Sequence, residues 1–160
     1  MKIFITGTDT DVGKTVVSGA LAKGLSLKNL NPKYWKPIQT GTETPEHIDR
    51  NFIDKCYPCS IPDGFDFAAP LSPDQAAQLE NKDAPSLEKI IKKYDSIGAD
   101  TLIIEGAGGL YVPLNDTTDT WMDFVSQANL PVLLVARTGL GTINHTSLSI
   151  NALLNDGADH

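Results

Sequence analysis

The residues with the clearest chemical meaning lie in a short loop near the start of the chain. Residues 3–5 are apolar and rich in β-forming types, which predicts a buried strand. A turn of Gly, Thr and Asp residues follows, ends in Gly13-Lys14-Thr15, and leads into apolar residues at helical spacing. The first N–H groups of a helix have no intrahelical partner and carry the positive end of its dipole. This order of strand, small-residue loop and helix predicts a phosphate-binding P-loop.

Two side chains of this loop add specific chemistry. Lys14 supplies a full positive charge for the β- and γ-phosphates of a nucleotide, and the Thr15 hydroxyl can ligate Mg²⁺. One position departs from the usual pattern G-x-x-x-x-G-K-[ST], because Thr8 stands first and Gly7 comes one residue early. The alternative is a chance Gly-Lys-Thr in an ordinary loop. The predicted strand before the motif and the helix after it favour the P-loop.

A second cation, Lys36, lies at the end of the predicted strand 33–38, just before Pro37. The alternative is an ordinary solvated lysine. At the end of a strand, however, its ammonium would face the P-loop and stabilise charge on a transferring phosphoryl group. Thr40, four residues further on, is a candidate hydrogen-bonding partner in the same place.

Glu105 follows the apolar strand 101–104 directly. A carboxylate at that place, across from the P-loop threonine, is suited to bind Mg²⁺ directly or through water. The small residues after it allow the backbone to approach a nucleotide closely; they are Gly106, Ala107, Gly108 and Gly109. Taken alone this segment is also consistent with a simple turn, and it lacks the G-x-G-x-x-G dinucleotide pattern.

The order of the predicted elements indicates the fold class. Strands at 3–5, 33–38, 101–104 and 131–136 alternate with helices after Thr15 and at 45–56, 74–79, from 86, 118–127 and 143–154. This alternation predicts an α/β, Rossmann-like three-layer fold with a mostly parallel sheet and helices on both faces. Ligands of such sheets bind at the carboxyl ends of the strands. The loops 7–15, 36–42, 105–109 and 137–142 should therefore line one crevice.

Composition narrows the function classes. The 160 residues fit one domain, 1–160, and the formal charge of −7 argues against binding to nucleic acid or an anionic membrane. No apolar stretch approaches the roughly 20 residues of a transmembrane helix, so we expect a cytoplasmic protein.

Cys56 and Cys59 form a C-x-x-C pair. This pattern is typical of a redox or zinc site. Its place in a Pro-rich loop and the lack of a second cysteine pair instead favour two reduced thiols.

Five segments together resemble the dethiobiotin synthetase family of the P-loop NTPase superfamily. The resemblance runs in order along the whole chain and is weakest over 44–66. The segments are Thr6-Gly7-Thr8-Asp9-Thr10-Asp11-Val12-Gly13-Lys14-Thr15, Lys36-Pro37-Ile38-Gln39-Thr40-Gly41, Pro70-Leu71-Ser72-Pro73, Glu105-Gly106-Ala107-Gly108-Gly109 and Leu140-Gly141-Thr142-Ile143-Asn144-His145.

The resemblance implies an ATP-dependent ligase of biotin biosynthesis. In that reaction a 7,8-diaminononanoate amine takes up CO₂ as a carbamate, ATP phosphorylates the carbamate to a carbamic-phosphoric anhydride, and the second amine closes a cyclic urea. By resemblance Lys36 is the catalytic lysine, Thr10 lies near the carbamate and Thr40 touches the substrate. The implied nucleotide-binding residues are Asp11, Val12, Gly13, Lys14, Thr15, Val16, Asp49, Glu105, Gly106, Ala107 and Gly108.

The resemblance also implies Mg²⁺ as cofactor, with Thr15 and Glu105 among its ligands. The third ligand is an aspartate on the helix after the Lys-Pro loop, where this chain has both Asp49 and Asp54. The segment Asp49-Arg50-Asn51-Phe52-Ile53 matches the family better and favours Asp49. A solvated aspartate on an exposed helix face is the alternative.

The start of the last predicted helix resembles the family's site for the substrate carboxylate. Free N–H groups at a helix start bind anions, and the resemblance implies Gly141, Thr142 and Asn144 as substrate contacts made across a homodimer interface. A plain helix start is the alternative. Family members continue past the position of His160 with an adenine-recognition segment, so we expect a chain truncated at its C-terminus, with an exposed sheet edge.

Three other functions are compatible with parts of the pattern. A cobyrinate amidase-type synthase needs a glutaminase domain, which this sequence lacks. A partitioning ATPase carries a signature lysine four residues before the last glycine of the motif, where this chain has Asp9. A non-catalytic nucleotide-binding module is the third alternative, and replacement of Lys36 would leave its behaviour unchanged.

Overall fold

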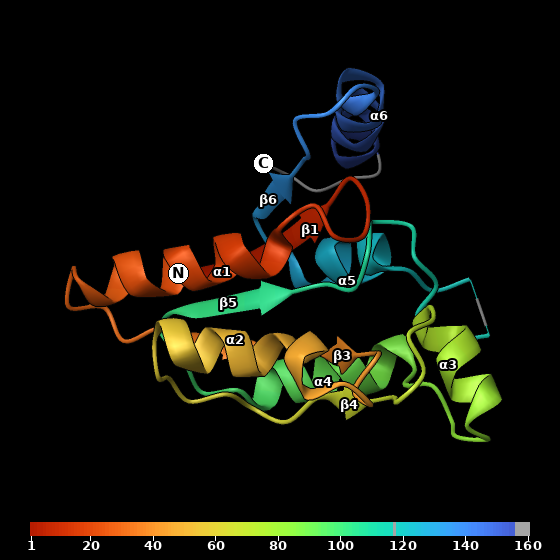
Figure 1. Cartoon of the computed structure of the whole chain (residues 1–160), viewed down its shortest axis with the longest axis horizontal. Helices are drawn as coiled ribbons and strands as arrows, with labels where there is room; N and C mark the ends of the chain where they lie inside the picture. The colour runs from red at the N-terminus through yellow and green to blue at the C-terminus, as the bar shows by residue number, and fades with distance from the viewer. Residues whose placement is uncertain (117, 156–160) are drawn as a thin grey trace.

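The computed structural model describes residues 1–116 and 118–155. Its centre is a four-stranded sheet in the order β2-β5-β1-β6, in which every neighbouring pair is parallel (Figure 1). The strands are β1 (Lys2–Gly7), β2 (Lys33–Trp35), β5 (Leu102–Glu105) and β6 (Val132–Val135). Because all four run the same way, their carboxyl ends meet at one edge, as the sequence predicted.

Helices connect these strands and form the outer layers. They are α1 (Lys14–Ser26), the short 3₁₀ turn η1 (Pro45–His47), α2 (Asp49–Cys56), α3 (Pro73–Leu79), α4 (Leu87–Ser96), α5 (Trp121–Ala128) and α6 (Thr142–Asn155). A second, two-stranded parallel sheet pairs β3 (Ile38–Gln39) with β4 (Phe65–Asp66). The predicted α/β class with a mostly parallel sheet is confirmed. Within the described residues every helix is too short or too polar to span a bilayer.

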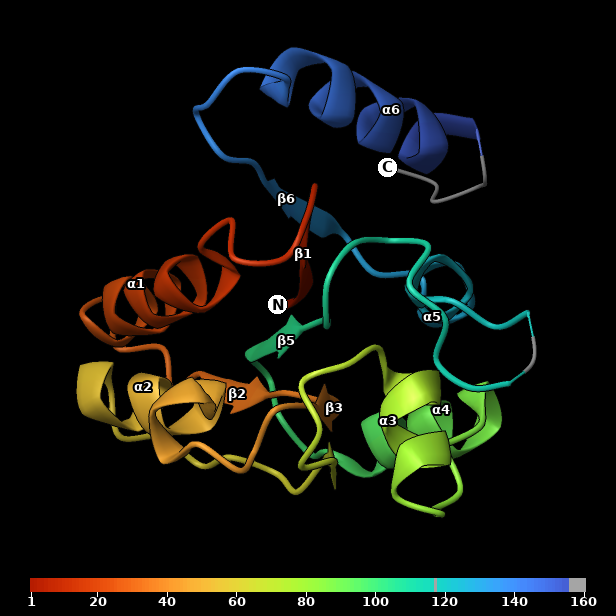
Figure 2. The ribbon, with the colours of Figure 1, turned by 45° about the vertical axis from the view of Figure 1, so that its right-hand side comes forward.

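Alternation along the strands divides the core between the two faces of the sheet. Phe4 and Ile104 belong to a cluster with side chains of α3, α4 and α5, whereas Ile5 and Ile103 pack with those of α1 and α2. Successive side chains of a strand point to opposite faces, so one strand contributes to both clusters. Figure 2 shows α1 and α2 on one side of the sheet and α4 and α5 on the other.

An aromatic group anchors the second of these layers. The ring of Phe124 on α5 lies with its centroid 5.7–6.4 Å from the rings of Phe4, Trp35, Tyr94 and Trp121. Tilted and edge-on contacts at this distance stabilise a core beyond simple area burial. The group fixes α5 against β1 and β2, and it also lies behind the loop that follows β5.

The boundaries of three elements differ from the predictions by more than two residues. The predicted strand 33–38 is confirmed only for Lys33–Trp35, because Pro37 has no N–H to donate and separates β2 from β3, which joins the second sheet. The predicted helix 45–56 is two pieces, and α2 begins only at Asp49. The helix predicted from 118 begins at Trp121, since Thr120 N donates to Asp123 Oδ2 at 2.7 Å in a capping box.

The expected exposed sheet edge is present among the described residues. The outer strand β6 pairs with β1, and its Val132, Leu133 and Leu134 are only half-buried. Helix α6 follows this strand and lies to one side of the other layers (Figure 1).

Candidate active site

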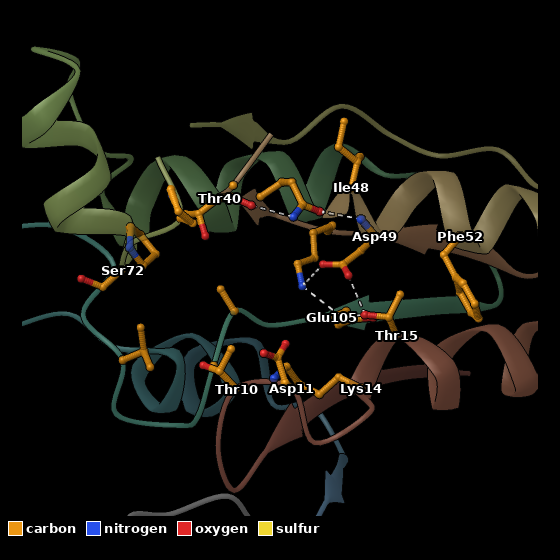
Figure 3. Close-up of a pocket in the computed structure, with 18 of the residues that line it drawn as sticks. Thr10, Asp11, Lys14, Thr15, Thr40, Ile48, Asp49, Phe52, Ser72 and Glu105 are labelled. Atoms are coloured by element: carbon orange, nitrogen blue, oxygen red, sulfur yellow. Dashed lines mark hydrogen bonds and ion pairs between the residues drawn. The ribbon is translucent and has the colours of Figure 1, made fainter. Parts of the chain in front are cut away.

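The carboxyl edge of the sheet borders a cavity of about 800 Å³, a size typical of small-molecule sites. Loops after β1, β2 and β5 form its wall together with the start of α2 and the segment before α3 (Figure 3). Its lining contains Thr10, Asp11, Gly13, Lys14, Thr15, Val16, Lys36, Gln39, Thr40, Gly41, Glu46, Ile48, Asp49, Phe52, Pro70, Leu71, Ser72, Pro73, Glu105, Ala107, Gly108 and Val112. Three of the four loops predicted to share one crevice therefore do so.

The loop between β1 and α1 has the backbone of a phosphate cradle. Gly13 stands at the N-cap of α1 with φ of 101°, a left-handed conformation that favours glycine. Lys14 is buried, and its Nζ donates to the carbonyl oxygen of Asp9 at 3.1 Å. Burial and the nearby charge of Lys36 lower the pKa of Lys14, because both disfavour a further positive charge.

The departure at the first position of the motif has a structural reason. A Cβ added to Gly7 would lie 2.7 Å from both the Asp9 carbonyl oxygen and Val12 Cγ2. The close approach that requires glycine therefore occurs at Gly7, one residue before the usual place. Val12 turns its side chain into the core beside α1 and does not line the cavity, whereas Asp11 and Val16 do.

Four polar side chains from four separate segments converge in the cavity (Figure 3). Lys36 Nζ lies 2.7 Å from Asp49 Oδ2 and 2.9 Å from Glu105 Oε1. Thr15 Oγ1 lies 2.6 Å from Asp49 Oδ1 and 2.9 Å from Glu105 Oε1, within reach of both with its one proton. Glu105 is fully buried and Lys36 is only 4% exposed. The P-loop, the β2–β3 junction, α2 and β5 are thus joined by one charged network.

The pKa values of this network follow from mutual charge neutralisation. Burial by itself lowers the pKa of Lys36, but the charges of Glu105 and Asp49 outweigh it and the net pKa is raised. Burial likewise acts to raise the pKa of Asp49, yet Lys36 and the hydrogen bond from Thr15 lower it overall. Both groups are therefore held in their charged forms at neutral pH.

Helix α2 presents Asp49 and not Asp54 to the cavity. Asp49 is the first residue of the helix, and its N–H donates to Gln39 Oε1 at 3.1 Å, which fixes the helix start against β3. Asp54 lies exposed on the same helix. Of the two candidates left open by the sequence, Asp49 is the one beside Thr15 and Glu105.

The gathered oxygen atoms suit a hard divalent cation. Two carboxylates and a hydroxyl are the ligand chemistry of Mg²⁺, which usually takes one or two carboxylates together with substrate phosphates and water. Among the side chains that the structure describes, no three of His, Cys, Asp or Glu gather as a metal cage. A magnesium ion completed by nucleotide phosphates fits this donor set.

The glycine-rich segment after β5 is held close to the sheet. A Cβ on Gly106 would lie 2.7 Å from Phe4 Cζ, so this residue has to be glycine or displace the core. The Gly106 carbonyl oxygen accepts from Lys36 Nζ at 3.2 Å, and the Ala107 carbonyl oxygen accepts from Trp121 Nε1 at 2.9 Å. Gly106 itself does not line the cavity, while Ala107 and Gly108 do.

The expected substrate residues fall into two places. Thr10 and Thr40 line the cavity. Gly141, Thr142 and Asn144 lie around the first turn of α6, outside the lining that the described residues form. Figure 2 shows α6 well separated from α2 and α3.

Several cavity residues carried no predicted role. Gln39 lies in the Lys-Pro-Ile-Gln-Thr-Gly segment, and residues 70–73 form another of the five segments that resemble the family. Membership in these segments could have indicated that both line the cavity. Ile48, just before α2, and Phe52 on α2 gave no local signal of a place in the cavity. Ser18 and Tyr34, which contact Glu105 from behind the cavity, were also missed.

Known proteins are similar to this chain in sequence along most of its length. A protein-family model described as an AAA domain matches residues 1–159. An ATP-dependent dethiobiotin synthetase of Anaeromyxobacter sp. (strain K) is 41% identical over an alignment of 157 positions, which covers 94% of this chain and 70% of the relative. The chain belongs to the dethiobiotin synthetase family.

Other dethiobiotin synthetases agree with this assignment. That of Bradyrhizobium sp. (strain BTAi1) is 42% identical over 98% of this chain and 71% of its own length. That of Brucella anthropi is 43% identical over 94% of this chain and 67% of its own length. The chain thus spans about 70% of the length of these family members. The resemblance stated from five segments is confirmed by identity across nearly the whole sequence.

Proposed function

We propose that this chain is an ATP-dependent dethiobiotin synthase that joins CO₂ to 7,8-diaminononanoate and closes the product to a cyclic urea. The observation that carries the proposal is the convergence of Lys14, Lys36 and the Thr15–Asp49–Glu105 oxygens on one cavity. Family membership supports the choice of reaction among P-loop chemistries.

The reaction brings negative groups together, and the cavity supplies cations for them. A substrate amine adds to CO₂ and loses a proton to give a carbamate. A carbamate oxygen then attacks the γ-phosphorus of ATP and releases ADP. The second amine attacks the carbamic carbon, loses a proton and expels phosphate, which closes the ring. The second step joins two anions, so positive charge at the transferring phosphoryl group lowers its barrier.

Each lysine has a distinct place in this scheme. Lys14, beside the P-loop backbone formed by Asp11, Val12, Gly13 and Val16, would hold the β- and γ-phosphates. Lys36 lines the same cavity and would neutralise charge on the transferring phosphoryl group. Thr15, Asp49 and Glu105 would hold Mg²⁺, which when bound neutralises phosphate charge. Gly106, Ala107 and Gly108 would let the backbone approach the nucleotide.

The substrate site is proposed to be shared between two copies of the chain. Thr10 and Thr40 would contact the carbamate end within the cavity. Gly141, Thr142 and Asn144 would bind the substrate carboxylate for the neighbouring copy, since they lie away from the cavity of their own chain. Leu140 and Ile143 are 103% and 81% exposed beside them, which supports a contact surface there. The proposal includes a cytoplasmic place of action, where ATP is supplied.

The direct test is product formation from diaminononanoate, labelled bicarbonate, ATP and Mg²⁺. We expect labelled dethiobiotin, with ADP release only when diamine and bicarbonate are both present. Lys36→Met should reduce turnover by at least 100-fold, as expected for loss of a group that stabilises charge in the transition state. Lys28→Met, at an exposed lysine after α1, should match the original chain. ADP release that ignores the diamine, or a fully active Lys36→Met chain, would overturn the proposal.

A further inference from the structure

We propose that Ser18 and Tyr34 form a hydroxyl clamp that holds one oxygen of Glu105 and so directs its other oxygen toward the magnesium position. The clamp rests on the proposed function, which makes Glu105 a magnesium ligand. Ser18 Oγ lies 2.7 Å from Glu105 Oε2, and Tyr34 Oη lies 3.1 Å from the same atom. Glu105 Oε1 instead faces Thr15 and Lys36 in the cavity.

The fold brings the two hydroxyls to this oxygen from different elements. Ser18 stands on the first turns of α1, four residues after Lys14. Tyr34 pairs with Ile103 in the neighbouring strand, two residues before Glu105. Side chains two apart on a strand share a face, so Glu105 and Tyr34 both point to the layer of α1.

The clamp is buried and directional. Ser18, Tyr34 and Glu105 are each fully buried, so the two hydroxyls meet the carboxylate away from bulk solvent. The Ser18 hydroxyl also lies 2.9 Å from the Lys14 carbonyl oxygen, but the carboxylate is nearer and charged and is the stronger acceptor. A tyrosine hydroxyl carries its proton at neutral pH and can donate it to the carboxylate.

Two donors on one oxygen restrict the rotation of the carboxylate. The last torsion of a glutamate is broad, so an unrestrained carboxylate samples many orientations. Partners that orient a metal ligand typically change metal affinity by 10–100-fold when they are removed. The clamp thus predicts a loss of affinity for the divalent cation. If the hydroxyls served only to satisfy a buried oxygen, their removal would lower stability and leave metal affinity unchanged.

The test measures Mn²⁺ binding in the presence of ADP, from the spectrum of free Mn²⁺ by electron paramagnetic resonance. Tyr34→Phe and Ser18→Ala should each weaken Mn²⁺ binding, and the double variant should weaken it by about 10–100-fold. The Mg²⁺ concentration for half-maximal activity should rise in the same ratio. Ser26→Ala on the same helix and Tyr57→Phe are matched controls, since their hydroxyls contact the Lys23 carbonyl oxygen and Asn31 Oδ1 instead.

The outcomes separate the clamp from the proposed function. Weaker Mn²⁺ binding supports the clamp even if no dethiobiotin forms, in which case the proposed reaction alone falls. Unchanged Mn²⁺ affinity in both single variants, or no Mn²⁺ binding by the original chain, overturns the clamp. Should Tyr34→Phe fail to fold, as judged by its thermal transition, Ser18→Ala alone decides the question.

Discussion

Lys36 Nζ lies 2.7 Å from Asp49 Oδ2, and this ion pair joins the β2–β3 junction to the first residue of α2. The same ammonium is 2.9 Å from Glu105 Oε1. The two carboxylates proposed to hold Mg²⁺ are therefore the two that hold Lys36. Cation and lysine would compete for the same oxygens, which has consequences for both stability and metal binding.

Replacing Lys36 by methionine should destabilise the protein when no divalent cation is added. Two carboxylates would then face each other with only Thr15 between them. Removing one partner of a buried pair costs about 3–5 kcal/mol. We expect the lower end, about 3 kcal/mol, because the Asp49 side chain is 23% exposed. Urea unfolding measures the loss.

Added Mg²⁺ should restore more stability to Lys36→Met than to the original chain, since the cation takes over the role of the ammonium. Lys28→Met should show neither effect. Equal stabilisation of both proteins by Mg²⁺ would contradict the idea that lysine and metal share ligands.

Asp49→Asn should weaken Mn²⁺ binding in the presence of ADP by more than about tenfold, since a direct ligand should matter at least as much as the partner that orients one. Asp54→Asn is a matched control on the same helix, because Asp54 is exposed. Titration calorimetry with Mn²⁺ distinguishes the two. A larger loss in Asp54→Asn would transfer the third ligand to that residue.

Which features could be predicted from the sequence depends on how far apart along the chain the interacting residues lie. The P-loop, Lys36 and Glu105 were predicted because each stands next to a strand end, and parallel strands bring their carboxyl ends together. Asp49 and Asp54 were not separated by local pattern, since both fit one helix. The structure separates them because α2 starts at Asp49 and turns Asp54 to solvent about one and a half turns later.

The contacts of Ser18 and Tyr34 with Glu105 were also not predicted from local sequence pattern. Their shared partner lies 87 and 71 residues away along the chain, and a serine in a helix or a tyrosine in a strand has no local mark of such a contact. The break at Pro37 was visible in the sequence, but the pairing of β3 with β4 was not. That pairing depends on Gly64, where an added Cβ would collide with the carbonyl oxygen of Lys36.

Gly7→Ala should impair nucleotide binding by at least tenfold. Its new methyl group would meet the Asp9 carbonyl oxygen and Val12, both within the P-loop, and the loop would have to shift. Gly24→Ala on α1 meets no atom within 4 Å and should leave binding unchanged, with a gain in stability of up to about 1 kcal/mol. Fluorescent ADP titration and thermal unfolding measure the two quantities. Normal ADP affinity in Gly7→Ala would show that the loop tolerates a side chain there.

Cys59 should react slowly with iodoacetamide at neutral pH. Burial against the cluster beside α2 raises the pKa of its thiol, despite an opposing contact with the Tyr34 backbone. A raised pKa favours the neutral thiol in the folded state, so folding stability falls as pH rises above the ordinary value of 9.0. Mass spectrometry across pH 7–10 should place the midpoint of Cys59 labelling above that of a free thiol. A midpoint below it would revive the redox reading of the C-x-x-C pair.

Ile143→Asp should both dissociate a dimer of this chain and reduce its synthesis of dethiobiotin. Ile143 is 81% exposed on the first turn of α6, next to the residues proposed to bind the substrate carboxylate of the neighbouring copy. In a two-fold symmetric dimer each copy presents the same surface, so one charge is introduced twice into an apolar contact. Sedimentation velocity should show a dimer for the original chain and a monomer for the variant. Leu27→Asp, at a residue 75% exposed after α1, is the matched control and should remain dimeric and active. A monomeric original chain with full activity would exclude a shared substrate site.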